Sequence, residues 1–227
     1  MKKLANIAPE GVFTYGGKRF VVMEHTEKGV FCLLEQSEEE SVFHSGDDAP
    51  RNDYRKATLR KKIEEEWLEE LFANGAKKSD LIPFELDLRE TDGSEGYGVI
   101  EVLAAPLTLW QNGKYKDIIP TDENGYWLAT PWKVRSPDTD DTSYAWRVGS
   151  DGDWYYYYVF VDYDTDGIRP ALMLSSDLLV STDDEDDAES CGECANYNVD
   201  LSRVETGALL KEIERRLSEG EQNVEGT

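Results

Sequence analysis

One stretch of this chain, residues 126–180, constrains its fold more than any other, because it sets a run of aromatic and acidic side chains between two motif-like ends. Residues 144–148 and 154–163 (WYYYYVFVDY) are rich in the aromatic and β-branched side chains that favour strands. Between these runs, Gly149-Ser150-Asp151-Gly152 contains Asp-Gly, which adopts the positive-φ turn of a tight hairpin. We therefore predict an antiparallel hairpin within a packed region of short strands.

The tyrosines of this hairpin divide between its two faces, because strand side chains alternate in direction. If Val159 and Val161 face the core, Tyr155 and Tyr157 join them. The other face then carries Trp154, Tyr156, Tyr158 and Phe160. A slip of one residue would reverse both sets. The alternative interpretation is that both faces are buried and the tyrosines are core residues with hydrogen-bonded hydroxyls.

The composition of the hairpin is typical of a recognition surface. Tyrosine gives a large contact area at a low entropy cost, and aspartate adds hydrogen-bond acceptors. The predicted ligand-binding residues are Tyr144, Arg147, Trp154, Tyr156, Tyr158, Asp162 and Tyr163. We expect them to bind a protein or a glycan. Alternating Tyr, Asp and Ser are also what adenine-directed diversification produces, so a diversified target protein is one form of this hypothesis.

The two ends of the stretch carry a family resemblance. Residues 126–132 read YWLATPW and residues 167–172 read GIRPAL. They resemble uncharacterised domains of Gram-positive bacteria and their phages, in which W-L-A-T-P or W-L-R-S-P precedes G-V-R-P-A-L by roughly 30 to 40 residues. Residues 11–22 and 52–68 resemble the opening hairpin and first helix of that family. Here Ala57 stands in place of the expected serine and Ile168 in place of valine.

The resemblance implies one domain over residues 1–181 with a mixed α+β fold. That fold is similar to the C-type-lectin-like folds, which include phage tropism proteins and the formylglycine-generating enzymes. Those enzymes use a cysteine pair inside the domain, whereas Cys191 and Cys194 follow it, so their activity does not carry over. The chain shows no phosphate loop, metalloprotease helix or nucleophile elbow, and we predict a non-enzymatic binding module.

The rest of the domain gives simpler signals. Glycine pairs and alternation predict strands at residues 12–15, 19–23 and 30–34, with a turn at Gly16-Gly17. The polar stretch 35–53 is predicted as a loop. Apolar residues at helical spacing predict a long helix over residues 54–73, capped by Gly75. A strand near 98–102 and a short helix near 107–115 are expected between this helix and the aromatic stretch.

The formal charge of -24, from 48 acidic and 24 basic side chains, disfavours direct binding to nucleic acid or to an anionic membrane. The simplest interpretation is solubility. The alternative function is an acidic anti-defence inhibitor, of the anti-CRISPR or DNA-mimic type, that occupies the basic groove of a nucleic-acid-binding immune protein. No apolar stretch is long enough to span a bilayer, and residues 1–10 lack an apolar signal core. We expect the protein in the cytoplasm of a host cell or in a virion.

An acidic linker, residues 182–199, is expected to follow the domain, because Asp183-Asp184-Glu185-Asp186-Asp187 cannot pack. It contains Cys191 and Cys194, which have the spacing of half a zinc site, but incidental use or a local disulfide is favoured. Residues 200–220 then form a predicted amphipathic helix. Such a helix docks on its own domain, self-associates with another subunit or binds a partner groove, and the first two are favoured.

Three carboxylates on alternating positions, Asp162, Asp164 and Asp166, match the opening of a calcium loop. Met173 stands at the twelfth position, where an EF-hand needs a bidentate carboxylate. An EF-hand is therefore not expected, and the predicted setting for calcium is a lectin-like loop in which Asp138, Asp140 or Asp141 completes the site. A solvated turn is the alternative, because turns favour the same residues.

Overall fold

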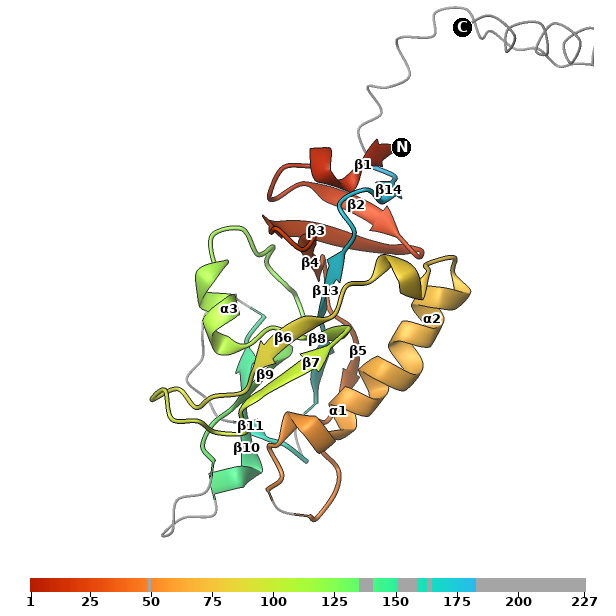
Figure 1. Ribbon diagram of the computed structural model, residues 1–227. Coiled ribbons are helices and arrows are strands. Elements are labelled where there is room, and N and C mark those ends of the chain that lie inside the picture. The colour runs from red at the N-terminus through yellow and green to blue at the C-terminus, as the bar shows by residue number, and fades with distance from the viewer. Residues whose placement is uncertain (49, 135–140, 151–158, 163–164, 183–227) are drawn as a thin grey trace, which may run out of the picture. The chain divides into compact units, whose positions relative to one another are not determined.

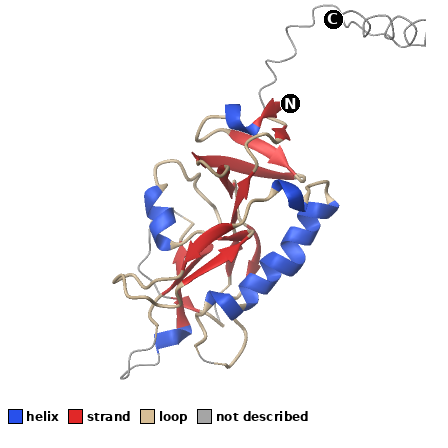
Figure 2. Cartoon of the chain, in the orientation of Figure 1, coloured by secondary structure: helices blue, strands red, loops and turns tan. Residues whose placement is uncertain are grey.

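The computed structural model describes residues 1–182 except 49, 135–140, 151–158 and 163–164 (Figure 1). The described residues belong to one compact unit, Met1–Asp183. This unit is mixed α+β, with mostly antiparallel strands and one long helix (Figure 2), which confirms the predicted fold class at that level. The predicted linker and C-terminal helix, residues 182–199 and 200–220, lie outside the described residues except for Thr182.

Two five-stranded sheets form the framework. The first is antiparallel and has the order β2 (Val12–Tyr15), β3 (Lys18–His25), β4 (Val30–Leu34), β13 (Pro170–Leu174), β8 (Ala104–Pro106). The second has the order β11 (Val159–Phe160), β10 (Tyr144–Val148), β9 (Tyr126–Pro131), β12 (Asp166–Ile168), β5 (Glu38–Ser41). In the second sheet only the β9–β12 pair is parallel.

Two short pairs and the helices complete the unit. The pairs are β1 (Lys2–Lys3) with β14 (Leu179–Val180), and β6 (Phe84–Asp87) with β7 (Val99–Val102). The α-helical elements are α1 (Thr58–Lys61), α2 (Leu68–Ala73) and α3 (Leu109–Lys114), and the π-helical turn η3 (Lys62–Trp67) connects α1 to α2. The 3-10 helices are η1 (Leu4–Asn6), η2 (Tyr54–Lys56), η4 (Lys78–Asp80) and η5 (Asp141–Ser143).

The opening strands follow the sequence prediction closely. Gly16 and Gly17 have φ of 55° and 74°, the left-handed geometry that a two-residue hairpin turn needs. Tyr15 consequently pairs with Lys18 across the turn. All five residues of β4 are buried, because this strand lies in the middle of the first sheet and is covered on both faces.

The long helix runs through α1, η3 and α2 and packs its apolar stripe on the core (Figure 1). Its end has the hydrogen bonds of a Schellman cap. The N–H of Gly75 donates to Phe72 O at 3.0 Å and the N–H of Ala76 donates to Leu71 O at 3.2 Å. Gly75 has φ of 98°, as this cap requires. The predicted helix and its cap are confirmed, except that its first residues form the separate turn η2.

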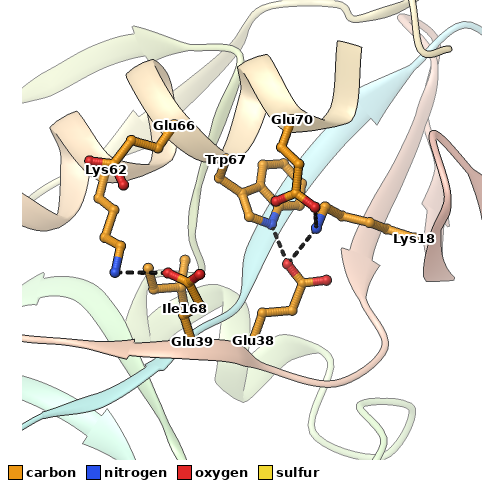
Figure 3. A pocket seen from close by; sticks show the side chains of 8 residues that line it. All are labelled: Lys18, Glu38, Glu39, Lys62, Glu66, Trp67, Glu70 and Ile168. Atoms are coloured by element: carbon orange, nitrogen blue, oxygen red, sulfur yellow. Dashed lines mark hydrogen bonds and ion pairs between the residues drawn. The ribbon is translucent and has the colours of Figure 1, made fainter. Parts of the chain in front are cut away.

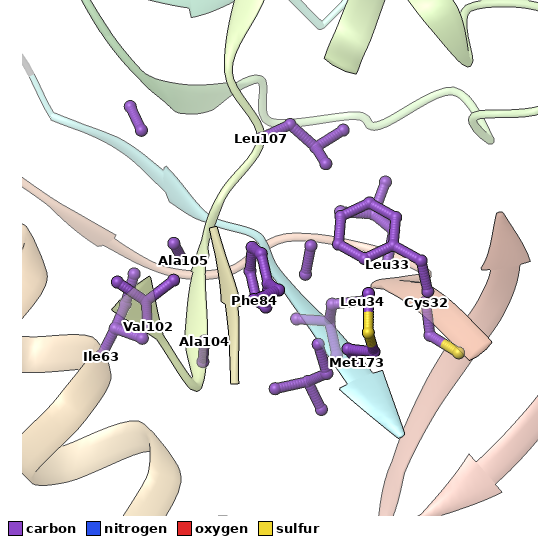
Figure 4. Packing of buried hydrophobic residues seen from close by; sticks show 14 of the residues in the cluster. Cys32, Leu33, Leu34, Ile63, Phe84, Val102, Ala104, Ala105, Leu107 and Met173 are labelled. Atoms are coloured by element: carbon purple, nitrogen blue, oxygen red, sulfur yellow. The ribbon is translucent and has the colours of Figure 1, made fainter. Parts of the chain in front are cut away.

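The apolar core joins the first sheet to the β6–β7 pair and to the helix (Figure 4). Phe31 and Phe84 meet edge to face, with ring centroids 5.4 Å apart. Ile63 brings the helix to the same cluster as Val102 and Ala104. Strand β9, the WLATP segment, is buried along its whole length, with Trp127 fully enclosed.

The prediction of a loop over residues 35–53 is wrong in part, because Glu38–Ser41 form β5. This strand lies at an edge of the second sheet and pairs only with β12, so two of its glutamates face solvent and no apolar alternation marks it. Trp127 Nε1 donates to Ser41 O at 2.6 Å and ties β5 to the core.

Arg169 lies between β12 and β13, at the point where the chain passes from the second sheet to the first. Only 1% of it is exposed. Its guanidinium donates to Leu34 O at 2.9 Å, to Pro120 O at 3.0 Å and to Glu35 O, and it lies 4.8 Å from the centroid of the Tyr126 ring. Asp122 is 3.8 Å away and balances its charge. Burial lowers the pKa of Arg169, and Tyr126 and Asp122 oppose that shift.

We expect Arg169→Met to lower the free energy of unfolding by about 3 kcal/mol, because it leaves buried carbonyls and Asp122 without their cation. Urea denaturation would show this as a lower midpoint at an unchanged m-value. The control is Arg19→Met, since Arg19 forms its ion pair with Glu35 near the surface and should change stability by less than about 1 kcal/mol. Equal losses in the two variants would contradict the structural role of Arg169.

Candidate functional site

The described part of the predicted aromatic surface lies at one edge of the second sheet. Tyr144 of β10 pairs with Phe160 of β11, and their ring centroids are 4.7 Å apart. Phe160 is 46% exposed, whereas the next residue, Val161, is fully buried. For these two residues the predicted alternation is confirmed. The edge therefore presents an aromatic pair to solvent. We call Tyr144 and Phe160 the edge aromatic pair.

An ion pair flanks this pair. Asp162 contacts Arg51 through its carboxylate, and both side chains are partly exposed. The backbone N–H of His44 donates to Val161 O at 2.8 Å, which fixes the chain between Phe160 and Asp162. Sequence reasoning had singled out Asp162 but not Arg51, which comes from the polar stretch predicted as a loop.

Asn52 fixes the backbone beneath Tyr144. Its Nδ2 donates to Tyr144 O at 2.8 Å and to Lys133 O at 3.0 Å, and its Oδ1 accepts from the hydroxyl of Tyr97 at 2.7 Å. Asn52 is completely buried, so this amide satisfies groups that water cannot reach. The backbone of Tyr144 is thus held by a buried side chain.

Arg147 and Asp166, predicted for different roles, contact each other. Arg147 Nη1 lies 3.0 and 3.1 Å from the two carboxylate oxygens of Asp166, whose exposure is 2%. Asp162 is engaged by Arg51, and Asp164 lies outside the described residues. Among the residues that are described, no group of three or more His, Cys, Asp and Glu is placed to hold a metal ion. The calcium site stays a prediction.

Four of the predicted ligand-binding residues, Trp154, Tyr156, Tyr158 and Tyr163, lie outside the described residues. Their roles stay predictions. The structure brings Tyr144, Phe160 and Asp162 to one edge of the sheet.

A second candidate site lies at the opposite edge of the same sheet, beside β5 (Figure 3). It is a cavity of about 300 Å³ between the long helix and β5. We call it the helix–β5 pocket. Its lining consists of Lys18, Glu38, Glu39, Lys62, Glu66, Trp67, Glu70 and Ile168.

Lys18 forms the inner wall of this pocket together with Trp67. Its ammonium donates to Glu38 at 2.7 Å and to Glu70 at 3.1 Å, and it lies 5.6 Å from the centroid of the Trp67 ring. Trp67 Nε1 donates to the same oxygen of Glu38 at 2.8 Å. Lys62 pairs with Glu39 at 3.0 Å on the other side of the opening.

The electrostatics of the pocket keep Lys18 charged. Burial by itself lowers the pKa of Lys18, but the hydrogen bonds that it donates to Glu38 and Glu70 and the negative charges of these residues raise it above its ordinary value overall. A protonated lysine is an ion-pairing group and not a nucleophile. The arrangement is therefore suited to holding charged groups in place.

The helix has an unusual turn at this pocket. Over Lys62–Trp67 its hydrogen bonds follow π-helical spacing, as in the bond from the N–H of Leu68 to Ile63 O. Such turns are rare and occur often at functional sites. Three of the lining residues, Lys62, Glu66 and Trp67, belong to this turn.

Sequence reasoning missed this pocket. Its carboxylates come from β5, whose sequence has no strand pattern, and from the solvent-facing side of the helix. The helix itself was predicted from the spacing of its apolar residues alone. The one available signal was Trp67, a tryptophan at the margin of that stripe beside Glu66 and Glu70.

Comparisons with protein-family models, with curated proteins and with solved structures gave no match to this chain. The family resemblance of the WLATP and GIRPAL segments stays a prediction. In the part of the chain that the structure describes, no helix combines the length and the apolar composition that crossing a bilayer requires.

We expect Lys18→Met to lower the free energy of unfolding by about 2 kcal/mol at neutral pH, because it removes two charge-assisted hydrogen bonds. The pKa of Lys18 is raised in the folded state above its ordinary 10.5. Its stabilising contribution is therefore complete below that pH and is lost as the pH rises through the folded-state pKa. The stability difference between wild type and variant should shrink accordingly in urea titrations at increasingly alkaline pH.

The control for this series is Lys61→Met, an exposed lysine on the same helix with the same change in charge. Its effect should be small and should not follow the titration of Lys18. A difference for Lys18→Met that is the same at neutral and at strongly alkaline pH would show that the ammonium contributes nothing.

Proposed function

We propose that this chain is a non-enzymatic binding module of phage or prophage origin, which engages a protein or a glycan through the edge of β10 and β11. The observation that carries the proposal is the edge aromatic pair. Exposed large aromatic side chains are frequent among the few residues that dominate binding energy at recognition surfaces. Phe160 meets this description, because it is 46% exposed and next to the fully buried Val161.

The surroundings of the pair support the proposal. The Arg51–Asp162 ion pair adds directional polar groups beside the rings, and Asn52 holds Tyr144 from below. Tyr156, Tyr158 and Trp154 precede Phe160 in the sequence, and alternation along a strand would bring them to its face. In this proposal they extend the aromatic surface, and their variation in related chains would make it a diversified target site.

We further propose a C-type-lectin-like fold for the unit. Its support is the late GIRPAL segment, which enters both sheets through β12 and β13 and is followed by β14 paired with β1. That closure by a late strand is what the resemblance implies.

We expect Phe160→Ser to weaken binding roughly 30-fold, the equivalent of about 2 kcal/mol, while leaving the melting temperature nearly unchanged. The control is Leu179→Ser, since Leu179 is 54% exposed but lies on β14. Capture from a lysate of a Gram-positive bacterium, followed by affinity measurements with the captured ligand, compares the two variants. The proposal fails if Phe160→Ser binds as tightly as the Leu179→Ser control. It also fails if the double variant Tyr156→Ala/Tyr158→Ala retains full affinity.

A second candidate function is the acidic inhibitor of a nucleic-acid-binding immune protein. It is favoured by one observation, the density of carboxylates on β5 and the long helix. They are Glu38, Glu39, Glu40, Glu64, Glu65, Glu66, Glu69 and Glu70. A partner held mainly by such charges would be released by moderate salt, because exposed charges are screened within about 10 Å at 0.1 M ionic strength. A partner held by the edge aromatic pair would persist in high salt.

A further inference from the structure

We propose that the helix–β5 pocket binds a primary ammonium group, presented by a free polyamine or by a lysine side chain of another protein. This inference goes beyond the proposed function, because the pocket and the edge aromatic pair lie at opposite edges of the second sheet. It rests on the charge of the lining, on the way in which the lining binds the Lys18 ammonium, and on the shape of the cavity.

The lining has an excess of negative charge. It contributes four carboxylates, Glu38, Glu39, Glu66 and Glu70, against the ammonium groups of Lys18 and Lys62. The two lysines are engaged by Glu38, Glu70 and Glu39. Among the described residues, none makes an ion pair with Glu66. An anionic ligand would meet this surplus of carboxylates, whereas a cation would balance it.

The inner wall shows how an ammonium is held here. The Lys18 ammonium donates hydrogen bonds to two carboxylates and lies over the face of an indole ring, and the Lys18 side chain is 8% exposed. Glu38 is itself oriented by Trp67 Nε1. Glu70 engages Lys18 with one oxygen but remains 59% exposed, so it can accept from a second donor. Glu70 and Glu66 stand one helical turn apart and supply the acceptors for an incoming ammonium.

The size of the cavity suits an ammonium on a flexible hydrocarbon stem. Its volume of about 300 Å³ is well above the space that one water molecule needs. Trp67 and Ile168 are the apolar parts of the lining, and they offer contact to methylene groups behind the charged head. A four-carbon alkylammonium, which lysine and polyamines share, would place its charged head against the carboxylates and its methylene groups against the apolar side chains.

The π-helical turn gives an independent reason to regard the pocket as a site. It places Lys62, Glu66 and Trp67 on the lining and departs from the hydrogen bonding of the α-helical segments on either side. π-helical turns are rare, and they occur frequently at functional sites.

Isothermal titration of the full chain at low salt tests the proposal, with spermidine and Nα-acetyl-lysine amide as separate probes. We expect saturable binding of at least one probe. The double variant Glu66→Gln/Glu70→Gln should weaken it at least tenfold. The matched control is Glu65→Gln/Glu69→Gln, which removes the same charge from the same helix at exposed positions that do not line the pocket.

Equal weakening by the two double variants would mean diffuse attraction to an acidic chain and would overturn the proposal, as would the absence of saturable binding for both probes. Glu66→Gln alone breaks no ion pair among the described residues, so a loss of binding in this variant is not a loss of folding. Binding of spermidine alone identifies a free polyamine, and binding of the lysine amide identifies a protein side chain. Phe160→Ser should leave both unchanged, which separates this site from the proposed function.

Discussion

The arrangement of this unit depends on the contacts of one buried cation, the guanidinium of Arg169. A buried cation must be surrounded by acceptors, and Arg169 draws its acceptors from two separate segments: the end of β4 with the residue that follows it, and the segment before β9. The chain leaves β12 and enters β13 at this residue, so the two sheets are fastened together where they exchange a strand. Asp122, which balances the charge, is held in turn by Ser37 just before β5.

The helix–β5 pocket lies beside these contacts, and the edge aromatic pair is connected to them through β9 and β10. Ser37 sets the start of β5, and β5 forms one wall of the helix–β5 pocket. Tyr126 lies against Arg169 at the start of β9 and pairs with Val148 of β10, at the end of that strand opposite to Tyr144. The contacts of one buried cation thus reach strands that lead toward both edges of the sheet.

Much of the fold could be predicted from the sequence where side-chain patterning and turn chemistry agreed. The strands around Gly16-Gly17 and the helix ending at Gly75 combined a periodic apolar pattern with a glycine of positive φ. Strand β5 could not be predicted, because an edge strand that presents glutamates to solvent has the composition of a loop. Phe160 and Val161 could be assigned to opposite faces, but Arg51 and the helix–β5 pocket could not, since both depend on contacts between distant segments.

The pairing of β1 with β14 sets Lys2 beside Val180 and Lys3 beside Leu179. The chain therefore enters and leaves this unit at one place, and Figure 1 shows that place at the end away from β10 and β11. A unit of this construction can be inserted into a loop of another protein without forcing the ends of that loop apart. Such an insertion would leave β10 and β11 at the end of the unit away from the point of attachment.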